Sequence, residues 1–232
     1  MSGGEAGATA LRWCDDTPVT LGWIDPRPAW MRRASHAVLS GGGVWILDPV
    51  DAEGIDERIR ALGEPMGVVR LLDRHERDCE QVARRLGVEL YTEPFEGVRG
   101  APFEVVPVVR IPRWHEIALW FPEEAVLACG DALCNAPGYS VPGEQVSVHP
   151  LMRLLPPRAL ERYPVRHLLL GHGSGVHGDD ARDAVHDALE QARRGLPRWA
   201  FSRARSLLGP LGRHSGGDRC VLDPDERPRG RP

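Results

Sequence analysis

The segment 68–86 constrains the fold most, because an apolar run, a polar cluster and a helical pattern follow one another in it without a break. Residues 68–72 read as a buried strand, and charged, imidazole and thiol side chains crowd the next positions, 73–79. Apolar residues then recur at helical spacing from Val82 to Leu86. The sequence therefore predicts a strand, a polar loop and a helix in succession, which is a unit typical of layered α/β domains.

The same alternation of short apolar strands and helical patterns runs along most of the chain. Residues 36–49 read as two strands around a Gly-Gly-Gly turn, and the β-rich stretch 103–129 contains a hairpin turn at 122–124. A helix is expected from Asp179 to Arg194. We expect one α/β domain over residues 1–200, and an Arg-, Gly- and Pro-rich C-terminal tail over 201–232 that is flexible.

Composition excludes several classes of function. The net charge of −4 gives no electrostatic footprint for nucleic acid, and we find no lysine for Schiff-base chemistry. The N-terminus lacks a signal-peptide pattern, and no apolar run is long enough to span a bilayer. Five cysteines without a C-x-x-C pair favour reduced thiols. We therefore expect a cytoplasmic protein that binds neither nucleic acid nor membrane, with a small-molecule substrate; nothing in the sequence indicates the oligomeric state.

Four landmarks, in order, give the chain a resemblance to a known fold. They are a strand ending in Asp48-Pro49, the polar loop 73–79, Gly130-Asp131 after a hairpin strand, and Gly171-His172-Gly173 before the last helix. This arrangement resembles the metallo-β-lactamase fold. The resemblance implies a four-layer αβ/βα sandwich, in which two sheets lie face to face with helices outside and metals bind on loops at one edge.

Metallo-β-lactamase-fold hydrolases carry the motif T-H-x-H-x-D-H at the polar loop. Read in that register, Arg74 stands at the first histidine and Glu76 at the second. A guanidinium is permanently charged and cannot coordinate a cation. The downstream P-G-H pattern of the family is also absent, and His115 is only a displaced candidate, next to Trp114, which could line a pocket. The resemblance therefore implies that the first of the family's two metal sites is lost.

The second metal site keeps possible ligands at every matched position. Asp78 and His172 match the family's pattern, Asp131 matches its bridging aspartate, and Cys79 stands where the last histidine would be. Thiolate, imidazole and carboxylate groups are all competent zinc ligands. The resemblance thus implies one bound metal, zinc or else iron or manganese, held by Asp78, Cys79, Asp131 and His172.

Arg74 suggests a further hypothesis about the lost site. Its guanidinium could occupy the volume of the first metal and pair with Glu76 or Asp131 through a charge-assisted bond. The pocket would then keep a built-in cation in place of one metal. His75 falls at a variable position of the motif and is expected to be an exposed pocket residue.

Simpler readings of these residues remain open. The loop could be a solvated turn with surface ion pairs of little energetic value. Cys79 could be a small core residue at the start of a helix, and Asp131 could be a turn former or a helix cap. His172 is harder to explain in this way, because its two flanking glycines let the backbone approach another group closely.

Three functions therefore compete. The first is a metal-dependent hydrolase of an ester, thioester or lactone, with Glu76 or Asp131 accepting a proton from water. The second is a non-catalytic protein of the same fold with a binding or structural role and no metal, in which Arg74, Glu76, Asp78 and Asp131 form a closed ion-pair network. The third is a partner-binding module in which the altered pocket is incidental. Function depends on the site and not on the scaffold, so the fold alone does not choose among them.

Overall fold

The first sheet of the protein is built by its N-terminal half. The structure is a computed structural model, and it describes residues 11–25 and 27–208. Six strands lie in sequence order in this sheet: β1 (Arg12–Cys14), β2 (Thr20–Ile24), β3 (Ala34–Ser40), β4 (Gly43–Leu47), β5 (Pro65–Arg70) and β6 (Glu89–Thr92). The pairing is antiparallel as far as β4 and parallel from β4 to β6. The parallel connections are crossovers through helices α1 (Ile55–Leu62) and α2 (Cys79–Leu86).

The second sheet is built by the C-terminal half. Its five strands lie in the order β13-β12-β9-β8-β7, and their bounds are β7 (Glu104–Ile111), β8 (Trp114–Phe121), β9 (Val126–Cys129), β12 (His167–Leu170) and β13 (Val176–His177). A separate ribbon pairs β10 (Leu133–Cys134) with β11 (Ser147–Val148). The remaining elements are three 3-10 turns and one long helix: η1 (Pro28–Trp30), η2 (Pro150–Met152), η3 (Arg158–Arg162) and α3 (Asp180–Leu208).

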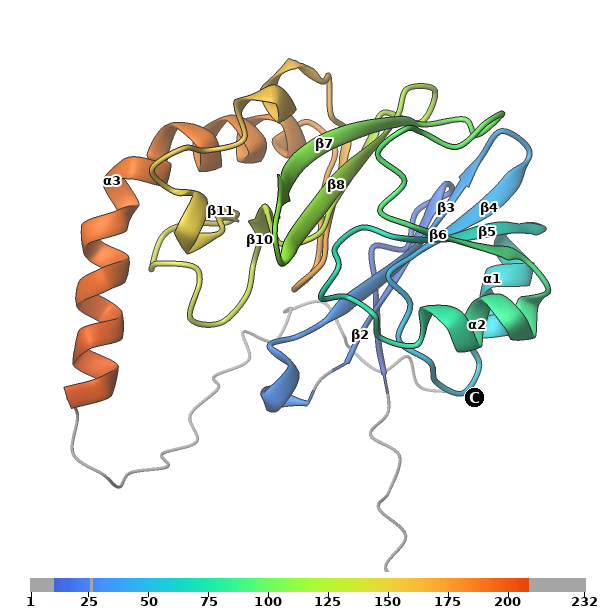
Figure 1. Cartoon of the computed structure of the whole chain (residues 1–232), viewed down its shortest axis with the longest axis horizontal. Helices are drawn as coiled ribbons and strands as arrows, with labels where there is room; N and C mark the ends of the chain where they lie inside the picture. Colours follow the sequence, from blue (N-terminus) through green and yellow to red (C-terminus); the bar gives the residue numbers. More distant parts are fainter. Residues whose placement is uncertain (1–10, 26, 209–232) are drawn as a thin grey trace, which may run out of the picture.

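Three hydrophobic cores hold four layers together. One core joins the two sheets and contains residues from both, such as Trp45 and Phe121. A second lies between the first sheet and helices α1 and α2, and a third lies between the second sheet and α3. Figure 1 shows the resulting order of helices, sheet, sheet and helix. The predicted four-layer α/β sandwich is confirmed.

The two sheets also pair with each other at two seams, where the chain at the end of a strand in one sheet meets a strand of the other. At one seam the chain before β3 pairs with the end of β12, through an Arg33–His172 bridge and a bond from the Ala34 amide to the Gly171 carbonyl at 2.9 Å. At the other, the chain after β5 pairs with β8 through a Leu72–Glu116 bridge. Backbone bonds on either side extend that second seam. The polar loop 73–79 begins where the second seam ends.

Most elements expected from the sequence are present, and the two differences have physical reasons. Strands β1 and β2 lie after the Gly- and Ala-rich start, in a stretch for which no individual strand is named from the sequence. Helix α3 continues past its expected end at Arg194, because Gly195 does not end the helix but lies close to another side chain. A Cβ atom on Gly195 would lie 2.2 Å from Nη1 of Arg153, so glycine permits that approach. The expected domain end at residue 200 falls inside α3, and residues 209–232 of the expected tail lie outside the described residues.

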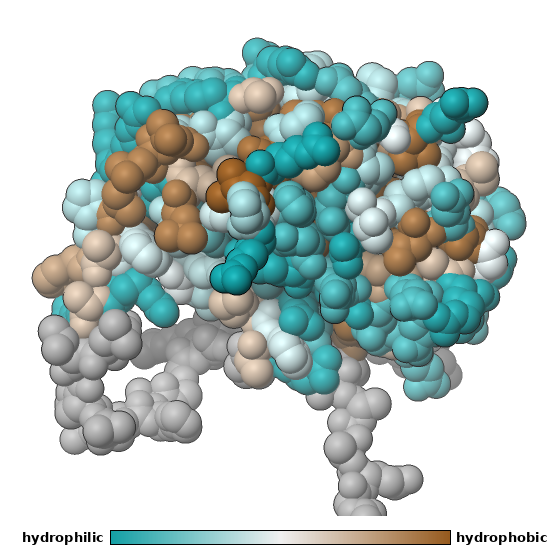
Figure 2. All heavy atoms as spheres, in the orientation of Figure 1, coloured by the Kyte–Doolittle hydropathy of each residue, from teal (hydrophilic) through white to brown (hydrophobic). Residues whose placement is uncertain are grey.

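The surface, the helices and the thiols of the described residues have the following character. Figure 2 shows a mostly hydrophilic face, with hydrophobic side chains gathered around the α3 and β11 side of the molecule. Within residues 11–25 and 27–208, no helix combines the length and the apolar character that a membrane span requires. Cys14, Cys79, Cys129 and Cys134 are free thiols.

Candidate functional site

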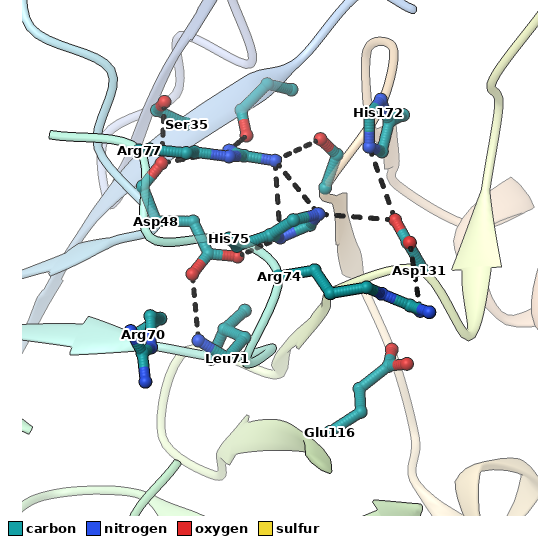
Figure 3. A network of polar contacts seen from close by, with 12 residues as sticks. Ser35, Asp48, Arg70, Leu71, Arg74, His75, Arg77, Glu116, Asp131 and His172 are labelled. Carbon is teal, nitrogen blue, oxygen red and sulfur yellow. Dashed lines mark hydrogen bonds and ion pairs between the residues drawn. The ribbon is translucent and has the colours of Figure 1, made fainter. Parts of the chain in front are cut away.

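The candidate site lies between the two seams, where loops leave β5, β9 and β12. Three buried side chains meet there: His75 from the polar loop, Asp131 after β9 and His172 after β12. One potential ligand atom from each lies within 4.8 Å of the others. Figure 3 shows the two imidazoles pointing toward the Asp131 carboxylate from different segments.

His75 is turned inward by the conformation of its loop. Its backbone amide donates to the Leu72 carbonyl at 2.8 Å, and Arg77 has a positive φ of 42° that closes the turn. The ring Nδ1 lies 2.8 Å from Oδ2 of Asp48, at the end of β4. A carboxylate only accepts, so Nδ1 carries the proton and the Nε2 lone pair faces the cluster.

Burial and Arg77 oppose a charge on His75, whereas the two neighbouring carboxylates favour one. The carboxylates of Asp48 and Asp131 outweigh the other effects, so the pKa of His75 is raised. The site thus attracts positive charge at Nε2 of His75, whether as a proton or as a metal ion.

His172 is oriented by the first seam. Its Nδ1 lies 3.0 Å from the Met31 carbonyl oxygen, which can only accept, so Nδ1 donates and Nε2 faces the cluster. The neighbouring Gly171 makes a close approach that a side chain would block. A Cβ atom there would lie 2.6 Å from the Gly130 carbonyl oxygen and 2.9 Å from Cε1 of His75. Glycine therefore brings the loops of all three residues together.

Asp131 is the centre of the cluster. Its Oδ1 lies 3.3 Å from Nε2 of His75 and 3.3 Å from Nε2 of His172. Oδ1 is buried and has no hydrogen-bond partner of ordinary geometry. Although burial acts in the opposite direction, the two histidines hold the pKa of Asp131 well below its usual range. The carboxylate is therefore ionised, and its inner oxygen lies between the two imidazoles without a hydrogen bond of ordinary geometry.

Arg77 fixes the frame around His75. Its guanidinium donates to the carbonyl oxygens of Ala34, Asp48 and Gly171, and so ties together the chain at the ends of β3, β4 and β12. One guanidinium nitrogen, Nη2, lies 3.3 Å from Nδ1 and 3.4 Å from Nε2 of His75. A nitrogen this close to both ring atoms lies over the ring face, so the contact is a stack and not a hydrogen bond in the ring plane.

Arg74 and Glu116 border the site on the side of the second seam. The Arg74 guanidinium lies over the Trp114 ring, 4.8 Å from its centroid, and its Nη2 is 3.8 Å from Oδ2 of Asp131. Glu116 is fully buried and accepts from Nε1 of Trp114 at 3.1 Å and from the Ala132 amide at 2.6 Å. Burial, and secondarily the charge of Asp131, raise the pKa of Glu116 to about 7.

The structure brings some of the expected site residues together and places others elsewhere. Asp131 and His172 share the cluster, and Arg74 and Trp114 lie beside it. The expected four-ligand set does not form, because Asp78 accepts from the Asp51 amide at 2.8 Å and Cys79 is packed in the core beneath α2. Burial raises the pKa of the Cys79 thiol, which disfavours the thiolate that would bind a metal.

Three further expectations are corrected by the positions of side chains. His75 was expected to be exposed and is 5% exposed, because the turn at 73–77 points it inward. Glu76, expected to accept a proton, is exposed and lines a cavity of about 580 Å³ with Arg70 and Cys79, away from Asp131. His115 alternates with buried Trp114 and Glu116 along β8 and points to the opposite, exposed side.

Two polar residues at the site were not singled out from the sequence. The sequence marks Asp48 only as the end of a strand and does not indicate its contact with His75 in the polar loop. The sequence gives His149 no role, but its ring packs edge-on against Trp114 with centroids 4.9 Å apart. Asp48 directly follows the buried strand β4, and the neighbouring strand β5 leads into the polar loop. This position is the signal that could have identified Asp48 as a site residue.

The chemistry of the cluster fits a divalent metal. Two imidazole nitrogens and one ionised carboxylate oxygen face one another, and the oxygen is buried without a hydrogen bond of ordinary geometry. Tetrahedral zinc with ligand bonds of about 2.0–2.1 Å separates neighbouring ligand atoms by about 3.3 Å. That separation equals both contacts of Asp131 Oδ1. Hydrogen bonds to the outer nitrogens of both histidines are also the usual support of metal-binding imidazoles.

Comparisons of the whole structure with solved structures point to one fold. DIM-1 metallo-β-lactamase matches with a TM-score of 0.55 and 14% identity, over 82% of this chain and 98% of that one. VMB-1 matches with a TM-score of 0.52 and 13% identity, over 85% and 100% of the two chains. FIM-1 metallo-β-lactamase from Pseudomonas aeruginosa, in its mono-zinc form, matches with a TM-score of 0.51 and 12% identity, over 80% and 97%.

Comparisons by sequence give no match. No family model matches this chain, and no curated protein matches it. At 12–14% identity the structural neighbours establish architecture and not activity. The chain has the metallo-β-lactamase fold.

Proposed function

We propose that this chain is a metallo-β-lactamase-like hydrolase that binds one divalent metal ion, of the zinc type, on His75, Asp131 and His172. One observation carries the proposal: one potential ligand atom from each of these three residues converges in a buried place, and Asp131 Oδ1 has no hydrogen bond of ordinary geometry there. Three protein ligands around an open position are the pattern of catalytic zinc sites, whereas structural sites are closed by four.

The residues around the cluster have separable roles in this proposal. A bound metal would supply a Lewis acid and a water of lowered pKa. Asp48 and the Met31 carbonyl hold the two imidazoles in the tautomer that binds. Oδ2 of Asp131, which faces Arg74, remains available to accept a proton from water. The bond that is cleaved belongs to an ester, a thioester or a lactone.

A single metal suits the changes in the polar loop. Arg74 lies beside the outer oxygen of Asp131 and supplies a fixed positive charge there. The mono-zinc form of FIM-1, a neighbour of the same fold, supports the idea that this scaffold accommodates one zinc ion.

A second candidate is a non-catalytic protein of this fold that binds no metal. The observation that favours it is the presence of two built-in cations, Arg77 stacked on His75 and Arg74 beside Asp131. The closed network expected from the sequence does not form in the part of the chain described, since Glu76 is exposed and Asp78 bonds to the Asp51 amide. Arg77 is moreover engaged by three carbonyl groups, and the inner oxygen of Asp131 keeps no hydrogen bond of ordinary geometry.

Metal analysis of purified protein tests the choice. We expect zinc, iron or manganese in the unmodified chain and its loss in the variants His75→Ala, Asp131→Ala and His172→Ala. Cys79→Ala is the matched control, because this thiol lies in the core beneath α2 and should not affect metal content. Equal metal content in the unmodified protein and in the three site variants would sink the proposal.

Activity is tested with the same variants. Ester, thioester and lactone substrates are offered to the protein before and after chelation, and again after zinc is restored. We expect hydrolysis that chelation abolishes and zinc recovers. Metal binding without any hydrolysis of the three substrate classes would favour the second candidate in a metal-binding form.

A further inference from the structure

Arg74 differs from the other arginine at the site in having unused donors. The guanidinium of Arg77 donates to three backbone carbonyl oxygens. Within the described ranges Arg74 makes no hydrogen bond; its contacts are the 3.8 Å approach to Asp131 and the stack on Trp114. Its side chain is 46% exposed, so the N–H groups at the edge of the guanidinium are open to a ligand in solution. Figure 3 shows this group directly below the Asp131 carboxylate.

The platform beneath Arg74 is rigid. Trp114 is 8% exposed, and its Nε1 donates to the buried Glu116 carboxylate at 3.1 Å. The indole therefore cannot turn without breaking a buried hydrogen bond. Stacking on a fixed aromatic face holds the guanidinium plane in place while leaving the edge of its donors free. Arg74 is thus presented to solvent in a preorganised form.

His149 adds a neutral donor on the same platform. Its ring packs edge-on against Trp114 and against Tyr139, with centroids 4.9 Å and 4.8 Å apart. Its Nδ1 accepts from the Leu151 amide at 3.3 Å, so the proton sits on Nε2. Burial lowers the pKa of His149 to about 4, which keeps the ring uncharged at neutral pH. Nε2–H has no acceptor among residues 11–25 and 27–208.

We propose that Arg74, on the face of Trp114, binds an anionic group of the substrate, a carboxylate or a phosphate, with His149 as a neighbouring donor. The planar fork of arginine matches both groups, because each offers two oxygens for parallel charge-assisted bonds. The anionic group lies next to Asp131, where the proposed hydrolysis takes place. The inference rests on the proposed function for the identity of the reaction, but anion binding itself needs no metal.

Calorimetric titration of inorganic phosphate and of succinate into metal-free, chelator-treated protein tests this inference. We expect at least one of the two probes to bind, and Arg74→Gln to weaken its affinity about tenfold or more. Arg113→Gln is the matched control, because Arg113 is also exposed and lies in the turn directly before Trp114. The probe that binds distinguishes a carboxylate from a phosphate.

Three results would overturn the inference. They are no binding of either probe to the unmodified protein, binding that Arg74→Gln leaves unchanged, and an equal loss in Arg113→Gln. Metal content measured before chelation, on the unmodified protein and on Arg74→Gln, keeps the two proposals separate. Anion binding that depends on Arg74, in a protein that carries no metal before chelation, would refute the hydrolase and spare this inference. Metal and hydrolysis without an effect of Arg74 on anion binding would do the reverse.

Discussion

The Asp48 carboxylate joins the end of β4 to the polar loop, because Oδ2 lies 2.8 Å from Nδ1 of His75 while Oδ1 accepts from the Leu71 amide at 2.8 Å. One buried side chain thus holds the backbone that enters the loop and the imidazole that the loop presents. The Asp48 side chain is buried, so water cannot replace either contact if that contact is lost.

Replacement of Asp48 by asparagine should weaken metal binding without unfolding the protein. The amide can still accept from the Leu71 amide through its oxygen, but its NH₂ group would donate to Nδ1 of His75. The ring would then carry its proton on Nε2, which cannot bind a metal in that state. We expect zinc affinity, measured by chelator competition, to fall about 10- to 100-fold.

The control for this variant is Asp179→Asn, which changes an exposed carboxylate at the start of α3. Zinc affinity of Asp179→Asn should equal that of the unmodified chain. Unchanged affinity in Asp48→Asn would mean that Asp48 does not set the tautomer of His75.

Removal of the Arg77 guanidinium should destabilise the whole sandwich. Arg77→Met keeps much of the aliphatic stem but leaves the carbonyl oxygens of Ala34, Asp48 and Gly171 without their donor. Buried acceptors without partners cost about 1–3 kcal/mol each, less where water enters, so we expect the free energy of unfolding to fall by about 2–4 kcal/mol. Urea denaturation measures this change.

Arg84→Met is the matched control for that substitution. Arg84 pairs with Glu80 on the exposed face of α2, where both side chains are more than 70% exposed. Its loss should change the free energy of unfolding by less than about 0.5 kcal/mol. A loss in Arg77→Met no larger than in Arg84→Met would show that the three carbonyl contacts do not stabilise the fold.

Glu116 predicts a pH dependence of stability. Burial, and secondarily Asp131, raise its pKa from 4.5 to about 7 in the folded protein. The folded state therefore binds more protons than the unfolded state between these pH values. The protonated Glu116 side chain contributes fully to stability below about pH 4.5. As pH rises through about 7, this contribution to the free energy of unfolding decreases by on the order of 3 kcal/mol.

Glu116→Gln removes the titrating group. The altered contact with Trp114 lowers the free energy of unfolding by an amount that does not depend on pH. We expect the free energy of unfolding of Glu116→Gln, relative to the unmodified protein, to increase between pH 5 and pH 8.5 in matched denaturation series. A relative stability that stays constant or decreases over this range would contradict the raised pKa.

Asp15 should control the mobility of the loop that carries His172. Its Oδ1 accepts from the Gly175 amide at 2.8 Å and lies 3.0 Å from Nε2 of His177. Asp15→Asn weakens both bonds, because an amide oxygen is a poorer acceptor than a carboxylate. We expect amide exchange over residues 171–178 to become faster, as measured by hydrogen–deuterium exchange.

Asp16→Asn is the neighbouring control, since its side chain is 65% exposed and pairs with Arg58 on the surface. Exchange over 171–178 should be the same in Asp16→Asn and in the unmodified protein. Equal exchange in all three proteins would show that the Asp15 contacts do not restrain the loop.

The layers of the fold follow from periodicity, but the members of the site do not. Strands such as β4 and β5 are apolar and bounded by turns, so their existence and order can be read from the sequence. The direction of a side chain in the polar loop depends on dihedral angles that composition does not encode. The positive φ of Arg77 is one such angle, and it belongs to a residue type that rarely adopts it.

The motif register illustrates this limit. Alignment with the family pattern put Asp78 and Cys79 at ligand positions, whereas the turn delivers His75 to Asp131 and starts α2 at Cys79. Asp131 and His172 could be selected because each follows a buried strand next to glycine. His149 lies 18 positions after Asp131 by number, and its packing on Trp114 arises from tertiary structure alone.

The two seams give the molecule a property of its own. The chain before β3 pairs with the end of β12, and the chain after β5 pairs with β8, so strands of each half continue into backbone pairing with the other half. The halves are therefore not independent modules that could be exchanged or expressed apart. They should fold as one cooperative unit. Because Asp131 lies between the two seams, binding of a ligand there should stabilise both halves together.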